Sequence, residues 1–198
     1  PMVAWKDEYE TRSTHRISYT NPVLKAVATA EGVTRNVFDF GKVSQSGTSA
    51  AAYHNPDSTG SFRFYDSKND AYVVDSYVYE VHEIYSDAYG STAQNVITDR
   101  GVGKEGSSVG TPYFKRGSNG ALVASDATNQ RVPNGDIWVD SEKAAASDVL
   151  QSGFHLLSFV PTDRVSVGSM ACNMTTRAGG CQVGELIGFS AKLSDDER

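Results

Sequence analysis

Apolar and polar residues alternate along several short stretches of the chain. This two-residue period is typical of strands that place one face against a core. In residues 36–41 (NVFDFG), Phe38 and Phe40 fall on one side of such a strand, and in residues 60–66 (GSFRFYD), Phe62 and Phe64 do the same. Turn-forming residues separate these stretches at fairly regular spacing, so the pattern predicts a β-rich protein.

Longer stretches extend the same pattern. Residues 71–87 form the longest β-rich run, which Asp75 and Ser76 interrupt, and residues 153–160 (GFHLLSFV) read as a nearly continuous apolar strand. Further strands are expected at residues 121–125, 135–140, 164–170 and 182–190, and long exposed loops at residues 41–60 and 98–112. Helical periodicity is found only in short pieces, in residues 141–150 (SEKAAASDVL) and at the C-terminal end.

Composition supports one β-domain. The chain has 198 residues with 18 Gly, 10 Tyr and 8 Phe, a turn-rich and aromatic mixture that is typical of extracellular sandwiches. Residues 1–198 are therefore expected to form a single domain. The net charge of −6 argues against a nucleic-acid partner, and no apolar stretch in the sequence is long enough for membrane insertion as a helix.

The C-terminal half resembles a known class of domain. Residues 184–189 (GELIGF) and 193–198 (LSDDER) resemble the closing segment of concanavalin A-like lectin/glucanase (LamG-like) domains. Residues 134–159 resemble the strand, hairpin and strand that precede this segment, and residues 37–41 (VFDFG) resemble an early strand. The resemblance implies an all-β, two-sheet jelly-roll sandwich with a short C-terminal helical turn. Domains of this class commonly occur in large bacterial surface and secreted proteins, and the fold itself does not define a ligand.

Enzymes of this class provide a test for catalysis. Their glycosidases carry two Glu around an Asp on one strand face, whereas this chain has EVHE at residues 80–83. Glu80 and Glu83 would lie on opposite faces of a regular strand, and the central Asp is missing. The Q-I-H motif of the related lyases does not occur in the chain either. We therefore predict no catalytic residues.

Aromatic residues suggest a sugar-binding surface instead. In a regular strand, Tyr77, Tyr79, Glu83 and Tyr85 share one face, which could stack on a sugar and accept a hydrogen bond from it. The same rings could equally form the core of a sandwich.

Trp138 presents the same alternative, because it lies opposite Ile137 and Val139. If all these rings are buried, the loops around His54 and Asp57 become the expected binding site.

Metal binding has weaker support in the sequence. The four histidines, His15, His54, His82 and His155, are scattered, so no zinc site is expected. Residues 55–60 and 66–70 form oxygen-rich loops that could hold calcium, but they lack the usual calcium-loop pattern. No cofactor is therefore predicted, with calcium left open.

The two cysteines, Cys172 and Cys181, flank a segment that ends in Gly179 and Gly180. These glycines would let the chain reverse, so we expect a disulfide between the two cysteines, which would indicate an oxidising compartment. The alternative is two separate buried thiols.

The C-terminus begins a helix that does not continue. Residues 194–197 (SDDE) form a capping box, in which the Ser194 hydroxyl accepts from the Glu197 N–H and the Glu197 carboxylate accepts from the Ser194 N–H. A helix of one turn is unstable alone, so we expect the chain to be part of a larger surface protein.

These observations favour a non-catalytic binding or adhesion module at the cell surface or outside the cell, whose partner is a glycan or a neighbouring surface protein. The alternatives are a purely structural module of a surface or fibre assembly and a polysaccharide-cleaving glycosidase or lyase.

Overall fold

The computed structural model describes residues 4–6, 23–41, 44–45, 63–65, 74–85, 94–98, 112–116, 121–123, 130–151, 153–165, 169–170, 172–173, 177–178 and 180–198. Within these ranges the chain is built from strands, and its one helical element is the 3-10 turn η2 (Asp195–Glu197). The strands are β1 (Ala4–Lys6), β2 (Val23–Ala28), β3 (Thr34–Asp39), β4 (Ser44–Gln45), β5 (Arg63–Tyr65), β6 (Ser76–Ile84), β7 (Gln94–Thr98), β8 (Pro112–Arg116), β9 (Asp136–Val139), β10 (Glu142–Ala144), β11 (His155–Val160), β12 (Ser169–Met170), β13 (Cys172–Asn173), β14 (Arg177–Ala178) and β15 (Cys181–Phe189).

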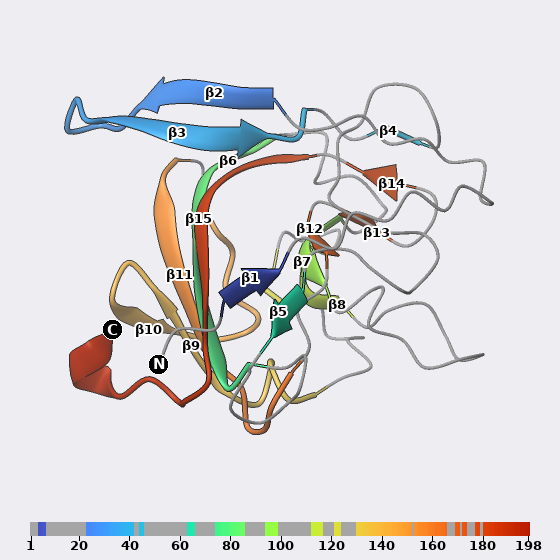
Figure 1. The fold of residues 1–198 in the computed structure, drawn as a ribbon, viewed down its shortest axis with the longest axis vertical. Helices are drawn as coiled ribbons and strands as arrows, with labels where there is room; N and C mark the ends of the chain where they lie inside the picture. The colour runs from blue at the N-terminus through green and yellow to red at the C-terminus, as the bar shows by residue number, and fades with distance from the viewer. Residues whose placement is uncertain are drawn as a thin grey trace.

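One antiparallel sheet of seven strands dominates the described structure (Figure 1). Its strand order is β10-β9-β11-β6-β15-β3-β2, so the two long strands β6 and β15 lie at its centre. Three small sheets accompany it, with the orders β1-β5, β12-β7-β8 and β13-β14-β4. The β-rich class predicted from the sequence is confirmed, whereas the two-sheet jelly roll stays a prediction.

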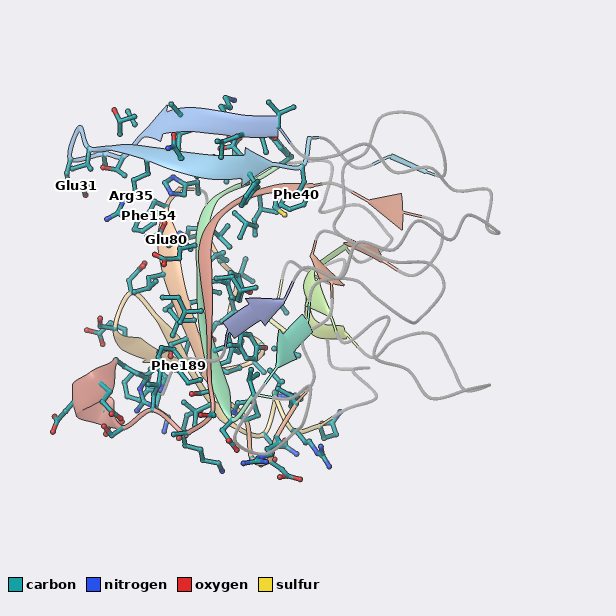
Figure 2. The ribbon with its side chains drawn as sticks, viewed as in Figure 1. Glu31, Arg35, Phe40, Glu80, Phe154 and Phe189 are labelled. Carbon is teal, nitrogen blue, oxygen red and sulfur yellow. The ribbon has the colours of Figure 1, made fainter. Side chains whose placement is uncertain are left out.

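The two faces of the large sheet have different surroundings. One face packs on the hydrophobic core, and we call the opposite face the outer face. The residues at alternating strand positions on the outer face are Trp138, Ser158, Val78, Glu80 and Ile187. Figure 2 shows Glu80 and Phe154 on this side of the sheet, below the β2–β3 hairpin.

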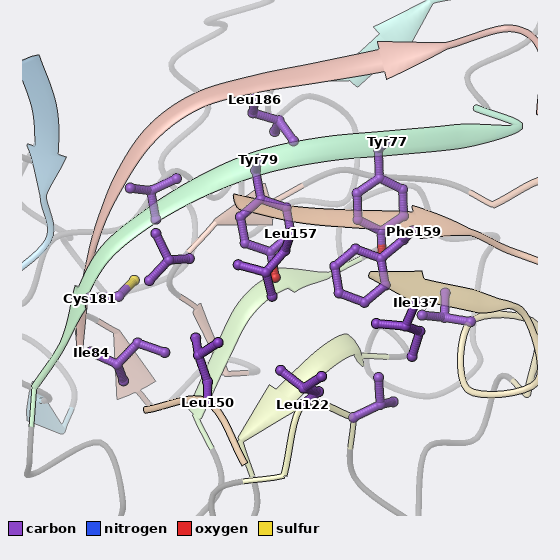
Figure 3. Packing of buried hydrophobic residues seen from close by; sticks show 14 of the residues in the cluster. Tyr77, Tyr79, Ile84, Leu122, Ile137, Leu150, Leu157, Phe159, Cys181 and Leu186 are labelled. Carbon is purple, nitrogen blue, oxygen red and sulfur yellow. The ribbon is translucent and has the colours of Figure 1, made fainter. Parts of the chain in front are cut away.

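The core contains parallel aromatic rings from two neighbouring strands (Figure 3). Tyr77 and Tyr79 of β6 and Phe159 of β11 are all 0% exposed. The Phe159 ring centroid lies 5.0 Å from that of Tyr77 and 5.7 Å from that of Tyr79. Aliphatic residues of the neighbouring segments complete the cluster, among them Ile137, Leu157, Val183, Leu186, Leu122 and Leu150.

Residues 141–150 do not form the helix that their composition predicts. Asp140 and Ser141 have positive φ angles of 51° and 70° and connect β9 to β10 as a two-residue hairpin loop. The Asp140 carboxylate accepts hydrogen bonds from the Leu156 N–H at 2.8 Å and the His155 ring Nδ1 at 2.6 Å. These tertiary contacts to β11 outweigh the local helix propensity of the alanine run.

Several predicted strands are confirmed. Residues 36–41, 71–87, 135–140, 153–160 and 182–190 overlap β3, β6, β9, β11 and β15, and the expected interruption at Asp75 separates β6 from an isolated bridge between Val74 and Val165. Residues 121–125 contribute only a bridge from Ala121 to Val149, so the strand predicted there is wrong for the part described.

The C-terminal capping box forms as the sequence predicts. The Ser194 N–H donates to the Glu197 carboxylate at 2.9 Å, as expected. The Ser194 hydroxyl also donates to that carboxylate, at 2.8 Å, while the Glu197 N–H donates to the Ser194 backbone carbonyl. Both contacts of the predicted box are present, from the Glu197 N–H to the Ser194 side chain and from the Ser194 N–H to the Glu197 carboxylate.

Candidate functional site on the outer face of the sheet

A β-bulge in β6 determines which residues reach the outer face. Glu83 pairs with Gln182, but the next residue of β15, Val183, pairs with Val81, so His82 is an extra residue in β6. As a result Val81 and Ile84 both join the core.

The bulge corrects two expectations that assumed a regular strand. Tyr77 and Tyr79 point into the core, whereas Glu83 and Tyr85 lie on the outer side, so the four do not share a face. Glu80 and Glu83, expected on opposite faces, both lie on the outer side.

A row of residues crosses the outer face from β10 to β15. The strand register aligns Lys143 with Trp138, Trp138 with Ser158, Ser158 with Val78, and Val78 with Ile187. Trp138, Val78 and Ile187 are partly exposed, while Ser158 is 6% exposed and its hydroxyl has no hydrogen-bond partner. The row therefore combines partly exposed apolar surface with an unsatisfied polar group.

Beside this row lies a charged cluster built on Glu80. The Arg35 guanidinium from β3 is 3.3 Å from one carboxylate oxygen of Glu80, and the His82 Nε2 is 3.8 Å from the other. Gly184 of β15 makes room for this side chain, because a Cβ there would lie 2.4 Å from Glu80 Oε2 and 3.0 Å from Glu80 Cβ. Three strands of the sheet thus fix the Glu80 carboxylate in place.

His82 is the most deeply buried polar residue of this cluster. Its side chain is 5% exposed, and its ring lies 4.8 Å from the Phe154 ring, which is partly exposed. The Nε2 atom has no hydrogen-bond partner, since the distance to Glu80 is too long. Burial lowers the pKa of His82; Glu80 opposes this shift and Arg35 adds to it.

A second polar cluster lies where β3, β6 and β15 meet. The Tyr85 hydroxyl donates to the Asp39 carboxylate at 2.8 Å, and Gln182 Nε2 donates to Asp39 at 3.0 Å and to the Tyr85 oxygen at 2.9 Å. Burial, and then the bond to Asp39, raises the pKa of Tyr85 to about 12. Burial alone would raise the pKa of Asp39, but hydrogen bonds from Gly41, Tyr85, Gln182 and Lys25 together lower it. This cluster is internally satisfied, so it stabilises the sheet rather than offering free groups to a ligand.

Trp138, like Glu83 and Tyr85, is a predicted binding residue that lies on the outer side of the sheet, and its side chain is partly exposed. The Arg198 guanidinium lies 4.3 Å from its ring centroid and Lys143 Nζ lies 5.8 Å from it. Its indole N–H is buried and has no hydrogen-bond partner.

The remaining residues considered for ligand or metal binding are only partly described by the structure. His54 and Asp57 lie outside the described residues, as do the two loops considered for calcium. Among the residues that are described, no group of three or more His, Cys, Asp and Glu side chains could hold a metal ion. His155 lies at the start of β11, where its ring Nδ1 contacts the Asp140 carboxylate.

The expected disulfide is wrong for Cys181, which is a free thiol, 1% exposed. Cys181 pairs with Ile84 and points into the core, and its pKa is raised to about 12 by burial and then by Asp39. The backbone of Cys172 pairs instead with Ala178 in a small sheet, and its side chain lies outside the described residues. The oxidising compartment therefore loses this support.

Sequence reasoning missed Arg35, Phe154 and Gly184. Arg35 shares its side of β3 with Asp39, and Phe154 precedes β11 in phase with Leu156, so strand parity could have placed both on the outer face. The role of Gly184 depends on a bulge that the local sequence does not predict.

No helix in the described part of the chain is long and apolar enough to cross a membrane. No family model matches the chain, and no curated protein or solved structure matches it. The resemblance to concanavalin A-like domains therefore stays a prediction.

Proposed function

We propose that the protein is a non-catalytic binding or adhesion module whose outer face holds a glycan. The proposal includes the concanavalin A-like jelly roll, of which the seven-stranded sheet would be one layer, and a location at the cell surface or outside the cell. A neighbouring surface protein is the alternative partner.

One observation carries the proposal. The outer face combines partly exposed rings and aliphatic groups, Trp138, Phe154, Val78 and Ile187, with the unpartnered polar atoms of His82 and Ser158. Sugar sites need this combination, because apolar faces of the sugar stack on rings while its hydroxyls bond to fixed polar groups. An unsatisfied buried polar group costs about 1–3 kcal/mol, so a hydroxyl that reached one would gain a favourable partner.

The charge pattern supports binding over cleavage. Because Glu80 and Glu83 share the outer side, strand parity no longer argues against a carboxylate pair. However, the Glu80 carboxylate is ion-paired with Arg35 at 3.3 Å, and its side chain is 14% exposed. A substrate would have to break this ion pair before Glu80 could transfer a proton.

A glycan array read together with a reducing-sugar assay tests the proposal. Binding without sugar release supports the binding module. Release of reducing ends would indicate a glycosidase instead, and the absence of any bound glycan would favour a structural module or a protein partner.

A further inference from the structure

The chain folds back over one end of the outer face after β15. The Ser76 hydroxyl, 0% exposed, donates to the Ala191 carbonyl at 2.7 Å, and Lys192 Nζ donates to the Thr162 carbonyl at 2.9 Å. These bonds direct residues 190–198, which we call the C-terminal segment, toward β9 and β10, where Figure 1 shows the C-terminal turn.

Arg198 ends this segment on the ring of Trp138. Its guanidinium carbon lies 4.3 Å from the ring centroid, a distance typical of a cation–π contact. Nη1 donates to the Leu193 carbonyl at 2.8 Å and Nη2 pairs with Asp195, so the guanidinium is held by the turn that carries it. Although Arg198 is a terminal residue of the sequence described, its side chain is only 7% exposed.

Polar atoms on both sides of the contact have no hydrogen-bond partner. The Arg198 Nε–H and the Trp138 indole N–H are buried without a hydrogen-bond partner, and the Ser158 hydroxyl, aligned with Trp138 in the sheet, also has none. A buried polar group without a partner is unfavourable, so any of these groups that water or a ligand reached would gain a partner. The segment is anchored through Ala191 and Lys192, and Arg198 adds the contact of its last turn with Trp138.

We propose that the C-terminal turn is a reversible cover on a Trp138 subsite. When Arg198 moves off, the indole ring becomes a stacking platform, and its N–H and the Ser158 hydroxyl become available to the hydroxyls of a saccharide. The cover and the ligand then compete for the same ring. The saccharide part of this inference rests on the proposed function, whereas the movement of the cover does not.

Acrylamide quenching of tryptophan fluorescence tests the cover without any ligand. The chain has two tryptophans, so Trp5→Phe leaves Trp138 as its only tryptophan. In this background, Arg198→Gln removes the cation, Arg198→Lys retains a charge there, and Lys25→Gln removes a cation at the opposite edge of the sheet. Loss of the cation–π contact should shift the equilibrium between covered and open turn by about fivefold. We therefore expect faster quenching in Arg198→Gln, an intermediate rate in Arg198→Lys, and no change in Lys25→Gln. Equal quenching in all variants would overturn the cover.

Binding to the array separates the two proposals. For a glycan that the wild-type protein binds, Arg198→Gln should raise the affinity by about the same fivefold factor, and Lys25→Gln should not. Unchanged affinity in Arg198→Gln would overturn the competition between cover and ligand. If no glycan bound to either protein, the proposed function would be wrong, and the quenching result alone would decide whether the cover exists.

Discussion

Leu156 and Leu157 are neighbours in β11 whose side chains lie on opposite faces of the sheet. The same substitution at the two positions therefore compares the core face with the outer face. Leu157 pairs with Tyr79, is 0% exposed and belongs to the core cluster. Leu156 pairs with Glu80 on the outer face and is partly exposed. The substitutions Leu157→Ala and Leu156→Ala remove the same atoms from the same strand, so their difference reports burial alone.

The expected magnitudes differ clearly. Truncating a fully buried leucine loses its transfer free energy and leaves a cavity, so Leu157→Ala should lower the free energy of unfolding by about 3 kcal/mol. For a domain of this length, that corresponds to a decrease in melting temperature of roughly 6–12 °C. Leu156→Ala loses only part of its contacts and leaves no closed cavity, so its cost should be about 1 kcal/mol or less.

Urea unfolding followed by far-ultraviolet circular dichroism measures both values. The slope of the unfolding free energy against urea concentration should stay the same in the two variants, since neither changes the surface exposed on unfolding. Equal costs, or a larger cost for Leu156→Ala, would show that the assignment of inner and outer faces is wrong.

Three further outcomes follow from the site. Gly184→Ala should destabilise the fold by about 1–3 kcal/mol, because its Cβ would collide with Glu80. In a Glu80→Ala background this penalty should shrink by about 1 kcal/mol. Additive costs of the two substitutions in the double variant would contradict the collision. The lowered pKa of His82 means that its contribution to stability is complete above the pKa of an unfolded histidine, about 6.5, and is lost as the pH falls through the folded value. His82→Gln should therefore reduce the decline in unfolding free energy between about pH 7 and pH 5, and an unchanged pH profile in urea titrations would argue against it. In a Cys172→Ser background, Cys181 should resist a thiol-specific disulfide reagent until urea unfolds the protein, because burial raises its pKa to about 12; rapid labelling of the folded protein would disprove its packing.

Periodicity predicted much of the central sheet. The alternation in residues 36–41 and the apolar run in residues 153–160 correspond to β3 and β11, since each strand has one face fixed by the core. Core packing of Tyr77 and Tyr79, one of the two alternatives left open by the sequence, is the arrangement found.

The candidate site was less predictable because it depends on departures from regular geometry. One extra residue, His82, reverses the parity of β6 and places Glu83 and Tyr85 on the side opposite Tyr79. Nothing in the local sequence requires a bulge there; it follows from how β6 pairs with β15. Likewise, the hairpin at Asp140 is stabilised by bonds to β11, which is distant in sequence from the alanine-rich segment that looked helical.

The outer face as a glycan-binding surface is tested most directly by array binding of matched variants. Phe154→Ala removes a partly exposed ring from the outer face, and Val149→Ala removes apolar surface from a residue that is 47% exposed and bridges to Ala121, away from that face. With both variants folded, we expect at least one glycan to bind the wild-type protein and Val149→Ala equally. The same glycan should bind Phe154→Ala about tenfold or more weakly, as expected for loss of a stacking ring. Binding that is identical in all three proteins, or absent from all three, would contradict this expectation.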